Sequence, residues 1–232
     1  MRIASRTARR FDTFDRRFDG IVTPILIDAG FAERQPYVFT RTDDSGQDVV
    51  YFDVEGKSFI VEAAFRPRYM DEIDDLYADT RVPKDPGVGA FSYLAPTCMT
   101  HRPKEFPCRL ARRRDHSFQL VAQGLKTHAQ DWLISLRDPT RYADAVPSTA
   151  IMYVARANEV AGRLNRAREA YEEAMRRLLA CWAMSTFGAF VEFEGARQFV
   201  YVCLKLGRES EKCERVMDAI KYRPHVEHLA GQ

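Results

Sequence analysis

The chain has 232 residues, of which 46% are hydrophobic and 29% are charged, the usage of an ordinary globular protein. A chain of this length buries most of the apolar surface that its unfolded form exposes, so it needs no disulfide or metal to fold. With 35 basic and 33 acidic residues the formal net charge is +2, which argues against nucleic acid or a membrane surface as a partner.

The cysteines indicate a reducing compartment. Five of them, at positions 98, 108, 181, 203 and 213, are odd in number and form no Cys-x-x-Cys pair. We therefore expect reduced, mostly buried thiols and a cytoplasmic protein. The basic N-terminal segment lacks the apolar stretch of a secretory signal, and every apolar run is far shorter than the roughly 20 residues that span a bilayer.

The first predicted element is an amphipathic helix over residues 11–29, because apolar side chains recur there at spacings of three and four. Pro24 lies inside this pattern, so the helix should kink there or restart with Pro24 in its first turn. Gly30 suits the left-handed position that ends a helix. A meander of three strands should follow at 37–41, 48–55 and 58–66, with tight turns between them.

The middle of the chain is punctuated by prolines and predicts a short helix within 69–79 and a fourth strand within 106–111. From residue 116 the pattern is helical: one helix to 136, two helices on either side of Gly162 up to 182, and two more at about 195–206 and 208–222. We predict an α+β fold, an antiparallel meander sheet with an N-terminal helix and a later packing helix, followed by a helical C-terminal part. The expected domains are 1–145, which holds the sheet, and 146–232, a helical extension that could pack on the same core.

A family resemblance is carried by apolar and glycine positions rather than by reactive groups. The matching residues are Phe18, Ile21, Pro24, Leu26, Gly30, Phe31, Tyr37, Phe39 and Arg41, then the segments VVYFDVEGKSFIVEAAF and HAQDWLISLRDPTRY. Over about residues 11–145 the chain resembles the bacterial domain-of-unknown-function family forty-three-zero-four. It departs from that pattern by its Pro-rich segment 67–105 and by its helical extension.

The resemblance implies a binding function. Members of this kind of family are often encoded beside toxin genes, and several look like immunity proteins that neutralise a cognate toxin in the cytoplasm. The family supplies no catalytic residues to carry over. The excess of Arg over Lys, 28 to 7, also suggests a GC-rich bacterial genome.

An acidic segment is the candidate partner-binding site. It concentrates five carboxylates within nine residues and contains no basic residue: Asp71, Glu72, Asp74, Asp75 and Asp79. They form either the solvated face of an amphipathic helix or a docking surface for a basic protein partner such as a nuclease toxin. A basic group consists of Arg109, Arg112, Arg113 and Arg114. It could hold phosphates, or pair with the acidic segment inside the same molecule.

Signals of catalysis are weak. The sequence contains no G-x-G-x-x-G, P-loop, G-x-S-x-G or H-E-x-x-H motif. Cys108, His116 and Asp115 could in principle form a nucleophile, base and orienting group, but inert buried cysteine explains Cys108 as well. Glu192 and Glu194 could do acid–base work, and His225 with His228 falls short of the three or four ligands that a metal site needs. We expect no catalytic residue, no metal and no cofactor.

Three hypotheses of function follow. The first is a cytoplasmic bacterial immunity-type protein that neutralises a cognate toxin by direct protein–protein binding. The second is a helical-repeat-like adaptor, because 157–178 is similar to one tetratricopeptide unit and 202–220 echoes it. The third is an enzyme of unrecognised class.

Overall fold

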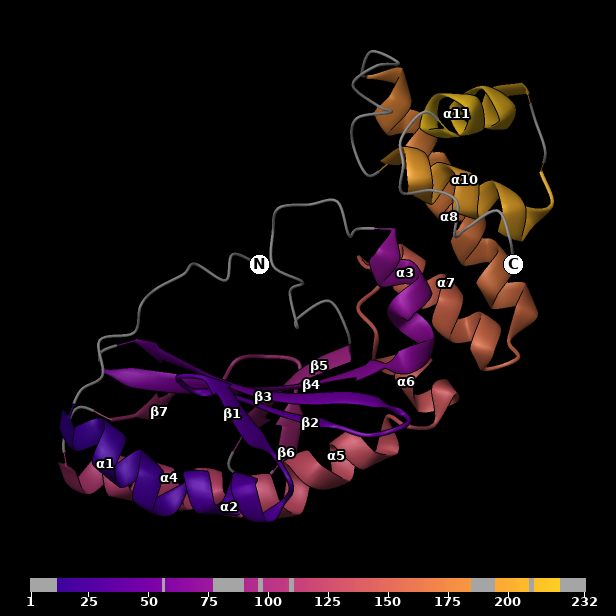
Figure 1. Ribbon diagram of the computed structural model, residues 1–232. Helices are drawn as coiled ribbons and strands as arrows, with labels where there is room; N and C mark the ends of the chain where they lie inside the picture. Colours follow the sequence, from indigo (N-terminus) through magenta and orange to yellow (C-terminus); the bar gives the residue numbers. More distant parts are fainter. Residues whose placement is uncertain are drawn as a thin grey trace. The chain divides into compact units, whose positions relative to one another are not determined.

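The computed structural model describes residues 12–55, 57–76, 90–95, 98–108, 111–184, 195–208 and 211–221 (Figure 1). These residues fall into two compact units. Unit 1 consists of the described residues within Met1–Tyr69 and Asp85–Val146, and unit 2 of those within Met70–Lys84 and Pro147–Gln232. The boundary expected after residue 145 lies one residue from a boundary between the units, while unit 2 also takes in a short segment from the first half of the chain.

Unit 1 opens with two short helices, α1 (Asp12–Ile21) and α2 (Thr23–Asp28). Pro24 lies in the first turn of α2, where its missing N–H and fixed φ are tolerated, so the predicted restart at Pro24 is confirmed. After α2, Gly30 adopts a left-handed φ of +84°. The N–H groups of Gly30 and Phe31 donate back to carbonyls of the last turn at 2.9 Å each, which is the Schellman ending of a helix.

The sheet of unit 1 contains seven strands within the described part of the chain, and every pair is antiparallel. Six strands follow in the order β1-β2-β3-β4-β5-β6, and β7 pairs with the start of β4. The predicted antiparallel meander is confirmed in β2, β3 and β4. The strands are β1 (Ala32–Gln35), β2 (Val38–Thr42), β3 (Gly46–Glu55), β4 (Ser58–Pro67), β5 (Ala90–Ala95), β6 (Cys98–Thr100) and β7 (Phe106–Pro107).

Three strands were missed by the sequence pattern, for identifiable reasons. All four side chains of β1 are exposed, so this edge strand has no apolar alternation. In β5 a buried polar residue, Ser92, occupies the same face as Leu94, and the short β6 pairs only with β5. The strand predicted over 106–111 is also shorter than expected, because the described strand β7 covers only Phe106–Pro107.

One face of the sheet is covered by helices α1, α2, α4 and α5 (Figure 1). The later packing helix, predicted over 116–136, runs as α4 (Ala111–Gly124), a π-helical segment η3 (Leu125–Ala129) and α5 (Gln130–Ser135). A further short helix, α6 (Pro139–Ala145), starts where only a helix stop was expected. The Asp138 side chain caps α6 by accepting from the Thr140 N–H at 2.8 Å.

The core of unit 1 lies between this sheet face and these helices, and it is rich in phenylalanine. On β3, Val50 and Phe52 face the helices and are each 1% exposed. Phe18 of α1 contacts Phe52 edge to face with ring centroids 4.8 Å apart, and Phe14 contacts Phe118 of α4 at 5.0 Å. The rings therefore join the N-terminal helix, the meander and the later helix into one core.

Unit 2 is helical in its described part. The predicted interruption at Gly162 is confirmed by its left-handed φ of +72° between α7 and α8. α8 packs on α7, α10 on α8, and α11 on α10, while the short α3 contacts α7. The helices are α3 (Asp71–Asp75), α7 (Ile151–Val160), α8 (Leu164–Ala183), α10 (Gly195–Leu206) and α11 (Glu211–Lys221). An antiparallel sheet with an N-terminal and a later helix, followed by C-terminal helices, confirms the α+β prediction.

Candidate functional site

The predicted acidic segment begins with helix α3, which contains four of its five carboxylates within Asp71–Asp75. The apolar residues Met70, Ile73 and Leu76 are fully buried, so the segment docks through one side as an amphipathic helix does. Asp71 is exposed, and the Glu72 side chain is 34% exposed. The side chains of Asp74 and Asp75 and the whole of Asp79 lie outside the described part of the structure.

Glu72 belongs to a charge cluster within unit 2, here called the α3 anchor cluster: Glu72, Arg156, Glu159 and Lys205. The Arg156 guanidinium lies 3.0 Å from Glu72 and 2.9 Å from Glu159. The Lys205 ammonium lies 3.0 Å from Glu159 and 3.8 Å from Glu72. The two carboxylates and two cations come from α3, α7 and α10, so the cluster is neutral overall and joins the three helices.

Two tyrosines adjoin the α3 anchor cluster. The Tyr171 hydroxyl donates to Glu159 at 2.8 Å, and the Lys205 ammonium lies 5.3 Å from the centre of the Tyr201 ring. Burial raises the pKa of both tyrosines. Burial alone would raise the pKa of Glu159 too, but hydrogen bonds from Arg156, Lys205 and Tyr171 outweigh it and leave that pKa below its ordinary value. Glu159 is thus held as an ion-paired carboxylate.

The sequence did not identify Arg156 and Lys205 as partners of Glu72, because they lie far from it along the chain. The available signal was small: Lys205 is the one basic residue in the last turn of α10, where its neighbours are apolar. Glu72 is thus paired within the protein, a role that neither interpretation of the acidic segment had assigned to it. The exposed Asp71 is compatible with both interpretations.

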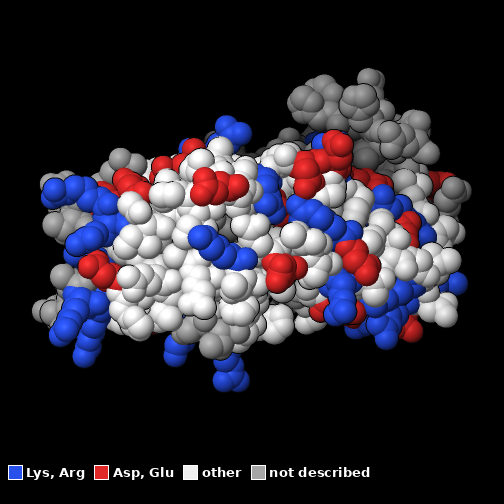
Figure 2. All heavy atoms as spheres, turned by 90° about the horizontal axis from the view of Figure 1, so that it is seen from below, with Lys and Arg blue, Asp and Glu red and all other residues white. Residues whose placement is uncertain are grey.

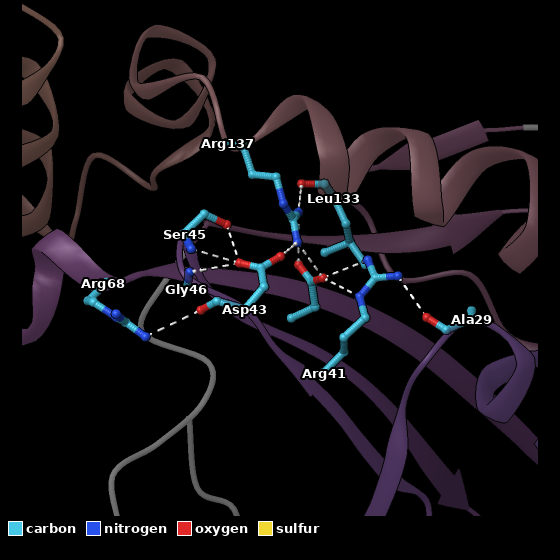
Figure 3. Close-up of polar contacts among 9 residues, drawn as sticks. Ala29, Arg41, Asp43, Ser45, Gly46, Arg68, Leu133 and Arg137 are labelled. Carbon is cyan, nitrogen blue, oxygen red and sulfur yellow. Dashed lines mark hydrogen bonds and ion pairs between the residues drawn. The ribbon is translucent and has the colours of Figure 1, made fainter.

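A second polar cluster lies in unit 1, where two arginines enclose one carboxylate (Figure 3). Asp48 of β3 is fully buried and accepts from Arg41 at 2.7 and 2.9 Å and from Arg137 at 2.9 Å. Arg137 also donates to Asp43 at 2.7 Å, and the hydroxyl of Ser45 donates to Asp43 as well. We call Arg41, Asp43, Asp48 and Arg137 the hairpin cluster, because three of them lie on or beside the β2–β3 hairpin.

The hairpin cluster ties helices to the sheet. Arg41 donates to the Ala29 carbonyl after α2 at 2.8 Å, and Arg137 donates to the Leu133 carbonyl of α5 at 2.8 Å (Figure 3). The Arg41 guanidinium lies 4.7 Å from the centre of the Phe31 ring, and that of Arg137 lies 5.0 Å from Phe65. Their N–H groups are directed to protein acceptors, so this cluster holds unit 1 together. Arg41, Phe31 and Arg137 also belong to the segments that carry the family resemblance.

The predicted basic group lies at the start of α4. Arg112 and Arg113 are exposed, Arg114 is half-buried, and Arg109 lies outside the described residues. The neighbouring Asp115 pairs with Arg17 of α1 at 3.7 Å. The structure therefore places the start of α4 beside Arg17 of α1, a proximity that the sequence alone did not suggest.

The candidate catalytic residues give little support to chemistry. Cys108 is buried, and burial raises the pKa of its thiol, which disfavours the thiolate that a nucleophile needs. The His116 side chain is exposed on α4. Four further candidates lie outside the described ranges: Glu192, Glu194, His225 and His228. Within those ranges no group of three or more His, Cys, Asp or Glu side chains is placed to hold a metal ion.

In the part of the chain that the structure describes, no helix is both long and apolar enough to cross a bilayer. Comparisons with protein-family models, with curated proteins and with solved structures find no match to this chain.

Proposed function

We propose that this protein is a cytoplasmic bacterial protein of the immunity type, which neutralises a toxin by binding a basic surface on it. The observation that carries the proposal is the acidic helix α3, docked through Met70, Ile73 and Leu76 with Asp71 exposed. Carboxylates presented on one docked helix attract a cationic partner, speed the encounter and select against acidic proteins.

The α3 anchor cluster supports a rigid presentation of this helix. Ion pairs from Glu72 to Arg156 and Lys205 restrain α3 before any partner arrives. A surface ordered in advance loses less conformational entropy on binding, so more of the contact energy appears as affinity. Glu72 itself is then a positioning residue, and Asp71, Asp74 and Asp75 are the residues that we assign to the partner.

Other features of the chain favour binding over catalysis. Among the described residues, the carboxylates with lowered pKa values are held in ion pairs by arginine or lysine: Asp43, Glu159 and Glu173. Cys108 is a buried thiol. The family resemblance also implies a binding role and provides no catalytic residue. The same resemblance is the basis for assigning a toxin as the partner.

The test begins with the reading frames that neighbour this gene: a basic nuclease-type domain encoded there is the probe, and the lack of any such toxin gene would count against the proposal. Isothermal titration at two salt concentrations should give binding that weakens with salt. Reversing three charges, Asp71→Lys, Asp74→Lys and Asp75→Lys, should weaken it roughly 10- to 100-fold and reduce the salt dependence, since exposed charge pairs each contribute little but act together.

A matched control carries the same change of net charge on exposed residues of unit 1: Asp28→Lys, Asp44→Lys and Asp131→Lys. It should bind like the wild-type protein. Equal loss of affinity in both triple variants would show that only overall charge matters, and unchanged affinity in the α3 variant would remove α3 from the interface.

A second candidate function is the helical adaptor. It is favoured by two successive helix pairs, α7 with α8 and α10 with α11, which contact each other through α8 and α10. Leu164 and Leu204 are 67% and 51% exposed in this unit. If the helices hold a peptide, Leu164→Glu with Leu204→Glu should abolish binding of the partner while the α3 charge reversals leave it intact, the opposite of the immunity-type result.

A further inference from the structure

Positive charge is distributed very unevenly along the chain. Residues 1–17 contain six Arg and two Asp, a local charge of +4. Residues 101–116 contain five Arg and one Lys against one Glu and one Asp, again +4. Since the whole chain carries only +2, the remaining residues together carry −6. The small net charge therefore conceals two basic segments.

The fold brings α1, which contains two of the six arginines of the first segment, together with α4, which belongs in part to the second. Phe14 of α1 contacts Phe118 of α4 with ring centroids 5.0 Å apart, and Arg17 of α1 lies 3.7 Å from Asp115 of α4. On the outside of this helix pair, four arginines are exposed: Arg16, Arg17, Arg112 and Arg113. Figure 2 shows Lys and Arg gathered at the end of unit 1 where α1 and α4 begin. We call these four residues the α1–α4 basic surface.

The side chains around this surface narrow the choice of partner. All three phenylalanines of α1 and α4, Phe14, Phe18 and Phe118, are buried in the core at 4% exposure or less. The two helices thus expose no phenylalanine ring that could insert into a bilayer. Beside the exposed side chains of Asp19 and His116 they present four guanidinium groups, which suit phosphate oxygens.

We propose that the α1–α4 basic surface binds the phosphate backbone of a nucleic acid without reading its sequence. A polyphosphate backbone repeats its charges at short spacing, so it can engage guanidiniums from two neighbouring helices at once and release counterions as it does. This inference goes beyond the proposed toxin binding and does not depend on it, since that function uses α3 of unit 2. The net charge of +2 argued against a nucleic-acid partner because it sums over the whole chain and hides the local positive charge.

The test is fluorescence anisotropy with a labelled 20-nucleotide single-stranded DNA of mixed sequence and the full chain, over a range of salt concentrations. Wild-type protein should bind at low salt with a dissociation constant near the micromolar range that is typical of sequence-independent contacts. The variant Arg17→Gln, Arg112→Gln, Arg113→Gln should bind about 10-fold or more weakly. Its slope of log affinity against log salt should be shallower by about 2, for three lost phosphate contacts.

The matched control changes three exposed arginines of α8 that have carboxylate neighbours: Arg168→Gln, Arg176→Gln and Arg177→Gln. It removes the same charge and should bind within about twofold of wild type, because its arginines lie elsewhere. Replacing Arg17, Arg112 and Arg113 by Lys keeps the charge and should restore most of the affinity, which separates lost contacts from misfolding.

Three outcomes would overturn the proposal. Wild-type protein with no affinity for the oligonucleotide at low salt is the first, and equal loss in the α8 control is the second. The third is binding to vesicles of phosphatidylserine and phosphatidylcholine with none to the oligonucleotide, which would assign the surface to anionic lipid. None of these results bears on the toxin titration, so the two proposals can fail separately.

Discussion

At the scale of single residues, Asp48 has the most demanding environment among the described carboxylates. Its side chain is fully buried, and its charge is matched by Arg41 and Arg137. Removing a carboxylate from water costs several kcal/mol, which well-placed ion pairs and hydrogen bonds offset. Both arginines are themselves only partly exposed, at 21% and 23%, so each depends on the carboxylate as much as the carboxylate depends on them.

Asp48→Ala should lower the free energy of unfolding by about 3–5 kcal/mol, because it leaves two guanidiniums partly buried without their shared partner. The measurement is urea denaturation followed by circular dichroism. Asp44→Ala, at an exposed position in the same hairpin, is the control and should change stability by less than about 0.5 kcal/mol. Equal effects of the two substitutions would mean that the hairpin cluster contributes nothing to stability.

At the scale of elements, the start of β3 depends on one glycine. Gly46 pairs with Pro67 at the end of β4, and an added Cβ would lie 2.2 Å from the Arg66 carbonyl oxygen. The nearest atoms all belong to the backbone of Arg66 and Pro67, so no side-chain movement could relieve this contact. The Asp43 side chain closes the same turn by accepting from the N–H groups of Ser45 and Gly46 at 2.8 and 3.2 Å.

Gly46→Ala should therefore destabilise the protein by roughly 2–3 kcal/mol through overpacking at the β3–β4 ladder. Gly20→Ala is the matched comparison, because Gly20 lies in helix α1 and its added Cβ would meet nothing within 4 Å. That substitution should be stabilising by up to about 1 kcal/mol, from helix propensity. The midpoint of thermal unfolding should fall for Gly46→Ala and rise for Gly20→Ala. A shift in the same direction for both variants would contradict the proposed overpacking at Gly46.

At the scale of the whole molecule, groups with shifted pKa values confine stability to a window of pH. Hydrogen bonds from Ser45 and Arg137 hold the pKa of Asp43 below its ordinary value, and Glu159 in unit 2 is also lowered. Each of these carboxylates stabilises the fold fully at pH values above about 4, the pKa that it has in the unfolded chain, and loses that effect as pH falls.

The alkaline limit comes from buried tyrosine and cysteine. Burial raises the pKa values of Tyr171 and Tyr201, and that of Cys203 to about 12. These groups stabilise the fold fully at pH values below their pKa in the unfolded chain, about 8.5 for cysteine and 10 for tyrosine, and lose that effect as pH rises.

The midpoint of urea unfolding should therefore be highest between about pH 5 and 8 and fall on both sides. Asp43→Asn should make the acid side shallower, because asparagine cannot take up the proton that Asp43 takes up on unfolding. Asp44→Asn is the control and should follow the wild-type curve. An acid side equally steep in all three proteins would show that Asp43 has no part in acid unfolding.

The two polar clusters mark the limit of what the sequence could predict about the candidate site. Asp71 and Glu72 stood out because like charges are adjacent in the chain, and that is a local signal. The partners of Glu72, Arg156 and Lys205, lie on helices that become neighbours only after folding. The same holds for Arg137, which reaches Asp43 and Asp48 from the other half of unit 1.

By itself the sequence determined the α+β class, the meander β2–β4, an interruption of the first helix at Pro24 and the break at Gly162. These depend on periodicity, proline and glycine, which act within a few residues. Only the tertiary structure decided the edge strand β1, the strands β5 and β6, the assignment of α3 to the helical unit, and the proximity of the arginines of α1 to those of α4. The physical reason is that burial and charge pairing arise between segments distant in the chain, and no local pattern of side chains encodes which distant segment will be the neighbour.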